Sequence, residues 1–178
     1  MRRLRYSVAM SLDGFIAGPN GEYDWIVQDP AIDFVALFKD FDTALMGRKS
    51  FVAALAMHPT GEMPGMNVVV CSTTLRAADY PNVTVFNRDV AAAVLALKQE
   101  EGKDIWLFGG GGLFRSMLDA GLVDGIEVAV IPVILGGGIP LIPPGARSPV
   151  LELTDTRTYP SGIVGLTYRV PATGVMGG

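Results

Sequence analysis

The sequence predicts an α/β fold in which a mainly parallel sheet ends in an antiparallel hairpin. Through the first two thirds of the chain, short apolar runs typical of strands alternate with segments of helical period. No helical segment separates the β-rich runs after residue 126, so those strands are expected to be antiparallel. Three strand ends lead directly into Gly47, Ser72 and Gly109, and parallel sheets bind their ligands at such ends.

Composition excludes several classes of protein. The chain has 178 residues, of which 49% are hydrophobic and 18% charged, as expected of one globular domain (residues 1–170) with a short tail (residues 171–178). A net charge of −4 without a basic stripe argues against nucleic-acid binding. No apolar run reaches membrane-spanning length and no signal peptide is recognisable. We therefore expect a soluble, cytoplasmic protein that binds a small molecule.

A metal site is not expected, because Cys71 and His58 are the only cysteine and histidine and zinc sites need more such ligands. A single cysteine also excludes an intramolecular disulfide. A nucleophilic Cys–His pair is the alternative. However, Cys71 ends an apolar run and His58 precedes a proline in a predicted loop, so we interpret both as residues without a catalytic role.

The first 41 residues are predicted to form a strand, a long loop and a helix. Residues 4–12 have the pattern of a strand, which Asp13-Gly14 ends. Residues 15–28 mix turn formers with aromatic residues. They form either a lid over a pocket or a surface connection pinned by Trp25, and we favour the lid. Asp29-Pro30 then supplies the cap and first residue of a helix that reaches about Phe41.

The next two strands end in polar turns. Residues 43–46 form a short strand, and the following turn, Gly47-Arg48-Lys49-Ser50, opens a helix. Two cations and a hydroxyl can neutralise and hydrogen-bond a phosphate, although solvated surface charges are the alternative for Arg48 and Lys49. Residues 67–71 form a strand that ends in Ser72-Thr73-Thr74. These hydroxyls suit a helix cap or a ligand contact.

A glycine turn follows the central strand. Residues 83–86 are predicted to form a strand and residues 90–100 a helix that Gly102 ends. Residues 105–108 form a buried strand, and Gly109-Gly110-Gly111-Gly112 connects it to a helix that ends near Gly121. Glycines at this junction let backbone N–H groups approach a phosphate closely. The alternative is a tight turn packed against a neighbouring helix.

The last third of the chain is β-rich. Residues 126–133 are predicted to form a strand, and residues 135–140 a flexible connection rich in glycine. Residues 150–158 and 163–170 form a hairpin about Pro160-Ser161-Gly162. The second strand of this hairpin alternates apolar and polar residues, so one of its faces is expected to be buried.

Five segments, in this order, resemble the signature segments of the dihydrofolate-reductase-like superfamily. They are residues 11–17, 46–50, 70–72, 108–111 and 135–141. Within the superfamily, the chain is most similar to the C-terminal reductase domain of RibD, the bifunctional deaminase-reductase of riboflavin biosynthesis, and to its stand-alone relatives. The resemblance extends from about residue 4 to residue 170. It implies a three-layer αβα fold with a mixed, mainly parallel central sheet, and a homodimer.

The resemblance implies NADPH as the cofactor. In this superfamily the turn that matches Gly47, Arg48, Lys49 and Ser50 holds the cofactor phosphates, and the strand end that matches Ser72 and Thr73 helps to hold the adenosine 2′-phosphate. Ala9 and Ile16 match segments that flank the nicotinamide. The pyrophosphate and nicotinamide side is assigned to the glycine turn and its neighbours, namely Phe108, Gly109, Gly110, Gly111, Gly112, Leu113 and Phe114. A cis peptide bond is implied between Gly109 and Gly110.

The substrate half of the resemblance is less specific. Folate reductases use a carboxylate on the first helix to help protonate the pterin, and the nearest match is Asp33, which as an alternative is an exposed helix acid. Trp25 is placed like the lid tryptophan. A phosphorylated pyrimidine would need a second cationic cluster, and the sequence does not reveal one.

The sequence therefore predicts a reductase that transfers hydride from NADPH to a small heterocyclic or sugar-linked C=N compound. Within the resemblance, the most similar activity is 5-amino-6-(5-phosphoribosylamino)uracil reductase. Dihydrofolate reductase activity is one alternative. A protein that binds NADPH without chemistry, in which Asp33 and Trp25 are structural, is the alternative from another class.

Overall fold

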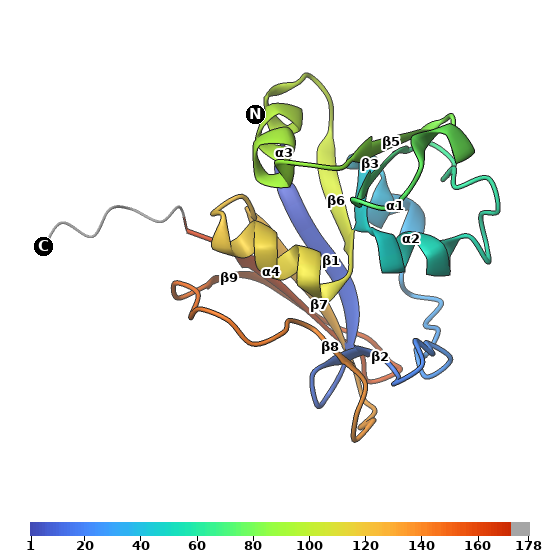
Figure 1. Ribbon diagram of the computed structural model, residues 1–178. Helices are drawn as coiled ribbons and strands as arrows, with labels where there is room; N and C mark the ends of the chain where they lie inside the picture. Colours follow the sequence, from blue (N-terminus) through green and yellow to red (C-terminus); the bar gives the residue numbers. More distant parts are fainter. Residues whose placement is uncertain (172–178) are drawn as a thin grey trace, which may run out of the picture.

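The computed structural model describes residues 1–171, which form an eight-stranded sheet with helices on both faces (Figure 1). The strands are β1 (Leu4–Ser11), β2 (Phe15–Ala17), β3 (Phe41–Gly47), β4 (Asn67–Cys71), β5 (Val83–Phe86), β6 (Asp104–Gly109), β7 (Gly125–Ile131), β8 (Ile139–Pro140), β9 (Glu152–Thr158) and β10 (Val164–Arg169). The helices are α1 (Phe34–Phe38), α2 (Arg48–Ala54), α3 (Val90–Gln99) and α4 (Gly111–Asp119), with a 3₁₀ turn η1 (Ala77–Asp79). Apart from Pro171, the predicted tail lies outside the described residues.

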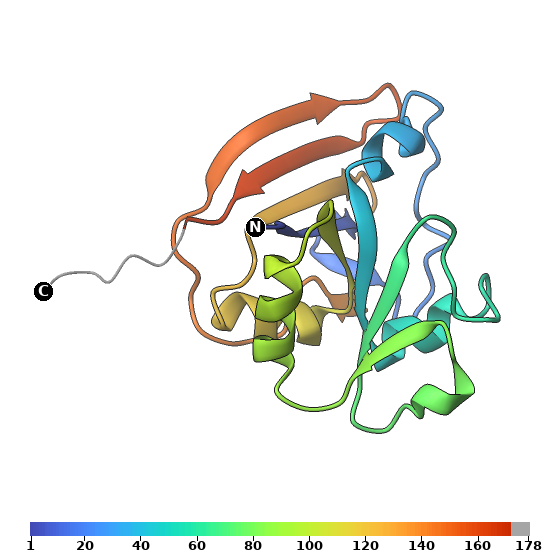
Figure 2. The same cartoon turned by 90° about the horizontal axis from the view of Figure 1, so that it is seen from above.

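The sheet is mixed and mainly parallel, as the sequence predicts. Its strand order is β5-β4-β3-β6-β1-β7-β10-β9. The pairs from β5 to β7 are all parallel, while β10 is antiparallel to both β7 and β9. Only β10 therefore runs opposite to the other strands, and the chain enters it from β9 through a short turn with no intervening helix. Figure 2 shows β9 at one margin of the sheet.

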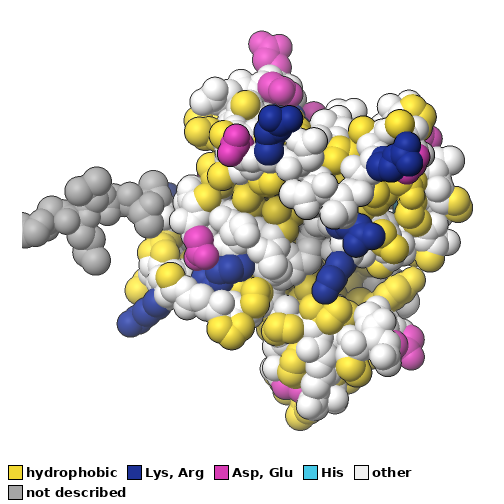
Figure 3. All heavy atoms as spheres, in the orientation of Figure 1, with side chains coloured by type: hydrophobic (Ala, Val, Ile, Leu, Met, Phe, Trp, Pro, Cys, Tyr) yellow, Lys and Arg dark blue, Asp and Glu magenta, His cyan; other side chains and the backbone are white. Residues whose placement is uncertain are grey.

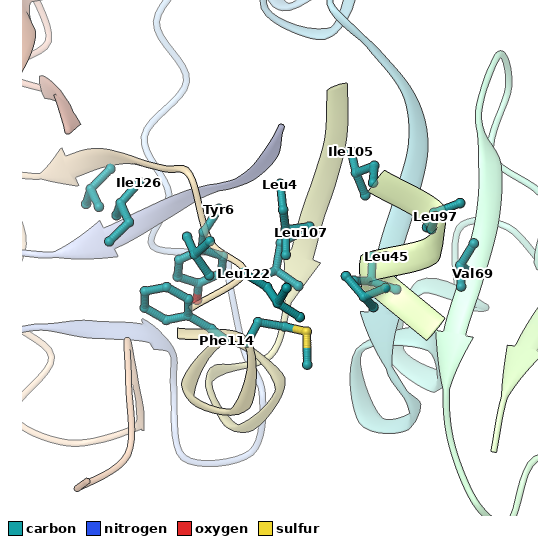
Figure 4. Packing of buried hydrophobic residues seen from close by; sticks show 14 residues of the cluster. Leu4, Tyr6, Leu45, Val69, Leu97, Ile105, Leu107, Phe114, Leu122 and Ile126 are labelled. Carbon is teal, nitrogen blue, oxygen red and sulfur yellow. The ribbon is translucent and has the colours of Figure 1, made fainter. Parts of the chain in front are cut away.

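Two core clusters lie on opposite faces of the sheet. One packs beneath α3 and α4 and includes Tyr6, Leu107 and Val128 (Figure 4). The other lies beneath α2 and includes Met46 and Val70. Successive strand residues point to opposite faces, so the alternate positions of each central strand feed these two clusters. On the α2 side, however, the strands β1, β7 and β10 present small or polar residues, and this part of the sheet borders a cavity.

The first helix differs from its prediction. We expected a helix from Asp29-Pro30 to about Phe41, but α1 has only five residues and begins after Asp33. Asp29 does not cap it. Its carboxylate instead accepts hydrogen bonds from the backbone N–H groups of Ala31, at 2.8 Å, and Ser161, at 3.0 Å. Asp29 therefore fixes this segment to the turn between β9 and β10, and Asp33 becomes the cap by accepting from the Ala36 N–H.

The predicted loop of residues 15–28 begins with a short strand. β2 pairs antiparallel with β8, which lies in the predicted flexible connection. A Cβ at Gly138 would collide with the carbonyl oxygen of Ala17, so only glycine permits the two segments to approach this closely. Strands of two and three residues carry too little periodicity to be predicted from sequence.

Candidate functional site

A cavity of about 1770 Å³ lies over the uncovered part of the sheet and reaches two of the predicted strand-end turns. Figure 3 shows a groove on this side of the molecule with Lys and Arg side chains beside it. Most of the predicted site residues line the cavity: Ala9, Ile16, Asp33, Gly47, Arg48, Lys49, Ser50, Phe108, Gly109, Gly110, Gly111, Gly112 and Leu113. Trp25, Ser72, Thr73 and Phe114 do not line it.

The glycine turn joins β6 to α4 at one end of the cavity. The peptide bond between Gly109 and Gly110 is cis, which confirms the geometry that the resemblance implies. Gly110 precedes the helix, and the first bond within the helix runs from the Phe114 N–H to the Gly110 carbonyl oxygen at 3.1 Å. The N–H groups of the first turn, from Gly111 to Leu113, therefore remain available to an anion.

The Gly47–Ser50 turn lies beside the glycine turn. A Cβ built on Gly110 would be 3.3 Å from Ser50 Oγ, so the Ser50 hydroxyl is adjacent to the glycine turn. Arg48 and Lys49 begin α2, are exposed and line the same end of the cavity. Within residues 1–171, neither forms a salt bridge with a carboxylate. Two uncommitted cations, one hydroxyl and a helix N-terminus suit a ligand that carries phosphates.

Two predicted cofactor contacts lie just behind this turn. Ser72 is buried, and its Oγ accepts hydrogen bonds from the N–H groups of Thr74, at 3.2 Å, and Leu75, at 3.0 Å. Ser72 therefore stabilises its own turn, and Thr73 beside it is exposed. The parallel register of β3 and β4 places Gly47 next to Cys71. A role for Ser72 and Thr73 in binding a 2′-phosphate stays a prediction.

Phe114 supports the glycine turn from the core. Its side chain is 2% exposed and stacks on Tyr6 with ring centroids 4.0 Å apart. Its N–H already closes the first turn of α4. Phe114 thus fixes the helix that carries the glycine turn, and its ring lies away from the cavity.

The other half of the cavity has a floor of very small residues. The strand register places Ala9 beside Ala129 and Ala129 beside Gly165, on adjacent strands. All three line the cavity. The neighbouring row consists of Ser7 and Glu127, followed by Thr167 on β10. The floor is therefore flat near the predicted nicotinamide position and becomes polar two residues farther from the glycine turn.

Aromatic residues form one wall beside this floor. Trp106 contacts Phe38 of α1, with ring centroids 4.6 Å apart, and Phe108, at 4.9 Å. The Trp106 indole N–H donates to the Ser7 carbonyl oxygen at 3.0 Å, which fixes the ring. Flat apolar surfaces with a few polar groups are typical of sites that bind planar ligands.

A charged network at the polar end of the floor was not predicted from the sequence. The Arg5 guanidinium donates to Glu127 Oε1 at 2.6 Å and to Asp104 Oδ2 at 3.1 Å. Burial acts to raise the pKa of Asp104, but hydrogen bonds from Arg3 and Arg5 hold this pKa below its usual value. Arg5 and Glu127 are the single charged residues of β1 and β7, which are central strands of the sheet. That pattern is the sequence signal that could have identified them.

The two predicted substrate residues differ in placement. Asp33 lines the cavity, and its Oδ1 accepts from the Ala36 N–H at 2.9 Å. Trp25 is half-buried outside the cavity lining, and its indole N–H donates to the Glu22 carbonyl oxygen at 3.0 Å. Tyr23 and Ile26, which flank Trp25, do line the cavity. Catalytic roles for Asp33 and Trp25 remain predictions.

The remaining reactive groups lie elsewhere. Burial raises the pKa of the Cys71 thiol to about 12, so this thiol is protonated at neutral pH and is a poor nucleophile. Within residues 1–171, no group of three or more His, Cys, Asp or Glu side chains is arranged to hold a metal ion.

No helix within residues 1–171 combines the length and apolarity needed to cross a membrane.

Sequence comparison identifies relatives of the whole domain. The chain is 37% identical to the uncharacterized protein YyaP of Bacillus subtilis, over 94% of this chain and 95% of YyaP. Identity to YwjB of the same organism is 28%, over 85% of this chain and 89% of YwjB. Identity to the riboflavin biosynthesis protein RibD of Corynebacterium ammoniagenes is also 28%, over 75% of this chain but only 44% of RibD.

Solved structures show the same fold. A protein of Shewanella sp. PV-4 assigned to riboflavin biosynthesis has a TM-score of 0.82 at 24% identity, over 96% of this chain and 99% of that one. The deaminase and 5-amino-6-(5-phosphoribosylamino)uracil reductase of Thermotoga maritima has a TM-score of 0.72 at 16% identity, over 96% and 57%. Dihydrofolate reductase of Enterococcus faecalis, solved with NADP(H), has a TM-score of 0.69 at 18% identity, over 94% and 95%.

These neighbours establish the dihydrofolate-reductase-like fold that the resemblance implied. The model of the RibD C-terminal domain matches residues 2–165, which is nearly all of the described part of the chain. The chain belongs to the RibD C-terminal domain family.

Proposed function

We propose that the chain is an NADPH-dependent reductase that delivers hydride to a C=N bond of a small heterocyclic or sugar-linked compound. One observation carries this proposal. The turns at Gly47–Ser50 and Gly109–Gly112 meet at one end of a single cavity, and the rest of that cavity is a flat recess beside them. A dinucleotide at the turns would thus have its reactive end next to a substrate in the recess.

The proposed cofactor contacts follow from charge and hydrogen bonding. Arg48, assisted by Ser72 and Thr73, would bind the adenosine 2′-phosphate, because a phosphate monoester demands charge-assisted donors. Lys49 and Ser50 would face the pyrophosphate together with the N–H groups at the start of α4. The solved dihydrofolate reductase of the same fold, which holds NADP(H), supports this choice of cofactor.

In the reaction, the cofactor supplies the hydride and the protein supplies position and electrostatics. Ala9, Ile16 and Phe108 would flank the nicotinamide, and the small floor of the recess lets a planar substrate lie against it. When hydride adds to the carbon of a C=N bond, the nitrogen takes a proton. Asp33 is the acid that we propose for this step, directly or through a water molecule.

The proposal is tested by cofactor titration followed by turnover. Tight binding of NADPH, weaker binding of NADH, and oxidation of NADPH when a C=N substrate is added are the expected results. Dihydrofolate and 5-amino-6-(5-phosphoribosylamino)uracil are the first substrates to compare. Saturable NADPH binding without turnover of any C=N compound tried would support the non-catalytic alternative. Failure to bind NADPH would overturn the proposal.

A further inference from the structure

We infer that the substrate half of the cavity accepts an unphosphorylated planar heterocycle whose N–H edge is bound by Glu127. This inference rests on the proposed function, since it assumes that the substrate occupies the recess beside the cofactor. The inferred ligand differs from a phosphorylated pyrimidine in that it carries no phosphate, because the charges that line the substrate half of the cavity disfavour a dianion. Three independent features support it: the charges of the lining, the free oxygen of Glu127 and the shape of the floor.

The two halves of the cavity differ in charge. At the end of the cavity formed by the Gly47–Ser50 and Gly109–Gly112 turns, the lining cations are Arg48 and Lys49. No carboxylate lines the cavity from β3, α2, β6 or α4. The substrate half is lined by four carboxylates and three cations, which are Asp33, Asp40, Glu127, Asp155, Arg5, Lys39 and Arg157. Carboxylates therefore outnumber cations in the half where a substrate phosphate would have to bind.

The cations of the substrate half are also mostly committed. Arg5 contacts Glu127 and Asp104 and is largely buried, whereas Arg157 pairs with Asp155 at 3.0 Å in a solvent-exposed pair that holds it only weakly. Lys39, an exposed residue after α1, is then the one lining cation of this half without a carboxylate partner within residues 1–171. A phosphate dianion needs several convergent charged donors. One solvated lysine and one exposed arginine that already faces Asp155, among four lining carboxylates, do not provide them.

Glu127 has one oxygen held and one oxygen free. Arg5 Nε and Nη2 both contact Glu127 Oε1, at 2.6 and 2.5 Å. Within residues 1–171, Oε2 receives no hydrogen bond. It is also not fully buried, so a ligand can reach it. The side chain is only 13% exposed and lines the cavity, so we infer that the accessible oxygen faces the substrate half of the cavity. It is a fixed, negatively charged acceptor for ligand N–H groups.

The floor places a planar ring against this acceptor. Ala9, Ala129 and Gly165 leave no side chain beyond a methyl group, while Trp106 closes one side. Glu127 is two residues from Ala129 on the same strand, which is a distance of about 6.6 Å along β7. A heterocycle on this floor would have its reacting bond near Ala9 and its far edge at Glu127. An amino group beside a protonated ring nitrogen, as in 2,4-diaminopyrimidine that carries a proton on N1, would present two adjacent N–H donors to the Glu127 carboxylate.

The test uses 2,4-diaminopyrimidine as a probe of the NADPH-loaded protein, with binding measured by calorimetry. Glu127→Gln should weaken this probe roughly ten- to hundredfold, the usual effect of losing a charged hydrogen bond, and leave NADPH affinity unchanged. The same ring with methyl groups in place of the amino groups should bind both proteins equally. If Glu127→Gln lowered the affinity for NADPH as much as the affinity for 2,4-diaminopyrimidine, the substitution would have caused a general structural defect, and this result would count against the inference.

The matched control is Glu152→Gln, which removes another strand carboxylate paired with an arginine, Arg169, but outside the cavity lining. It should leave affinity for the probe unchanged. A second measurement needs no variant: wild-type protein should bind 5-amino-6-(ribosylamino)uracil more tightly than its 5′-phosphate. Tighter binding of the phosphate, no binding of 2,4-diaminopyrimidine, or an unaffected Glu127→Gln variant would each overturn the inference. Absence of NADPH binding would instead refute the proposed function.

Discussion

Arg48 is an exposed arginine at the start of α2 that lines the cavity and forms no salt bridge within residues 1–171. If it binds the 2′-phosphate, Arg48→Ala should weaken NADPH binding by about 1.5–3 kcal/mol, since a charged hydrogen bond is lost. NADH affinity should change little, and titration of both cofactors measures the difference. Arg147→Ala, an exposed arginine away from the cavity, is the control. Equal losses for NADPH and NADH would refute the assignment.

Asp33 lines the cavity from the N-cap position of α1, where one of its carboxylate oxygens accepts a hydrogen bond from the Ala36 N–H. If its other oxygen assists protonation, Asp33→Asn should lower kcat while NADPH affinity stays within twofold, because the amide preserves the cap but cannot donate an acidic proton. Steady-state kinetics with an identified substrate, beside cofactor titration, checks this. An unchanged kcat would make water the proton source.

The residues that the sequence revealed are those whose local context is sufficient. Arg48 and Gly109 follow strand ends directly, and this arrangement is visible in the chain order. Arg5 and Glu127 were missed because their meaning depends on register, which brings residues 122 positions apart into contact across β1 and β7. Asp29 was misassigned as a helix cap because its partner, Ser161, lies 132 positions away. Sequence spacing cannot show such pairings.

At the scale of elements, α4 packs against the segment that contains β8. A Cβ on Gly111 would lie 3.0 Å from the Pro140 carbonyl oxygen and 3.1 Å from that of Leu141. Both are backbone atoms, so Gly111→Ala should destabilise the fold by about 1–3 kcal/mol through overpacking. A Cβ on Gly112 meets nothing within 4 Å, so Gly112→Ala should be neutral or slightly stabilising. Denaturant unfolding of both variants measures this, and equal stabilities would contradict the packing argument.

Elements flanked on both sides by turn-forming residues were predicted most accurately. β4 and β5 have the predicted bounds, since turn residues flank both apolar runs. α1 was predicted too long because its apolar spacing continued to Phe41, which instead begins β3 beside β6. Tertiary pairing overrode helical periodicity there, as it commonly does in short segments.

At the scale of the molecule, β9 is the outer strand of the sheet and is exposed at every position. Leu153 on this strand is 52% exposed, and Val150 just before it is 82% exposed. The homodimer implied by the family resemblance would cover such an edge, because unpaired strand edges favour association. Light scattering should then report a dimer, and Leu153→Lys should shift it toward monomer. A wild-type monomer at all concentrations would contradict this prediction.

The stability of the whole fold should fall in acid, because carboxylates that join distant segments of the chain have lowered pKa values. Hydrogen bonds from Ser11, Leu135 and Gly136 lower the pKa of Asp13, and those from Ser161 and Ala31 lower the pKa of Asp29. Burial opposes this effect at Asp104, yet Arg3 and Arg5 keep its pKa low. These contacts link the turn after β1 to the connection after β7, the segment before α1 to the β9–β10 turn, and the start of β1 to the start of β6.

A carboxylate whose pKa is lower in the folded than in the unfolded state binds fewer protons when folded. Its contribution is therefore fully present above the unfolded pKa, near 3.8 for aspartate, and is lost as the pH falls through the folded pKa. The free energy of unfolding should be level near neutral pH and decline below about pH 4. Asp104→Asn, which removes one such group at the centre of the sheet, should lower stability at pH 7 and flatten that decline. Denaturant unfolding across this pH range measures both effects, and an acid limb as steep in the variant as in the wild type would exclude Asp104 as a contributor.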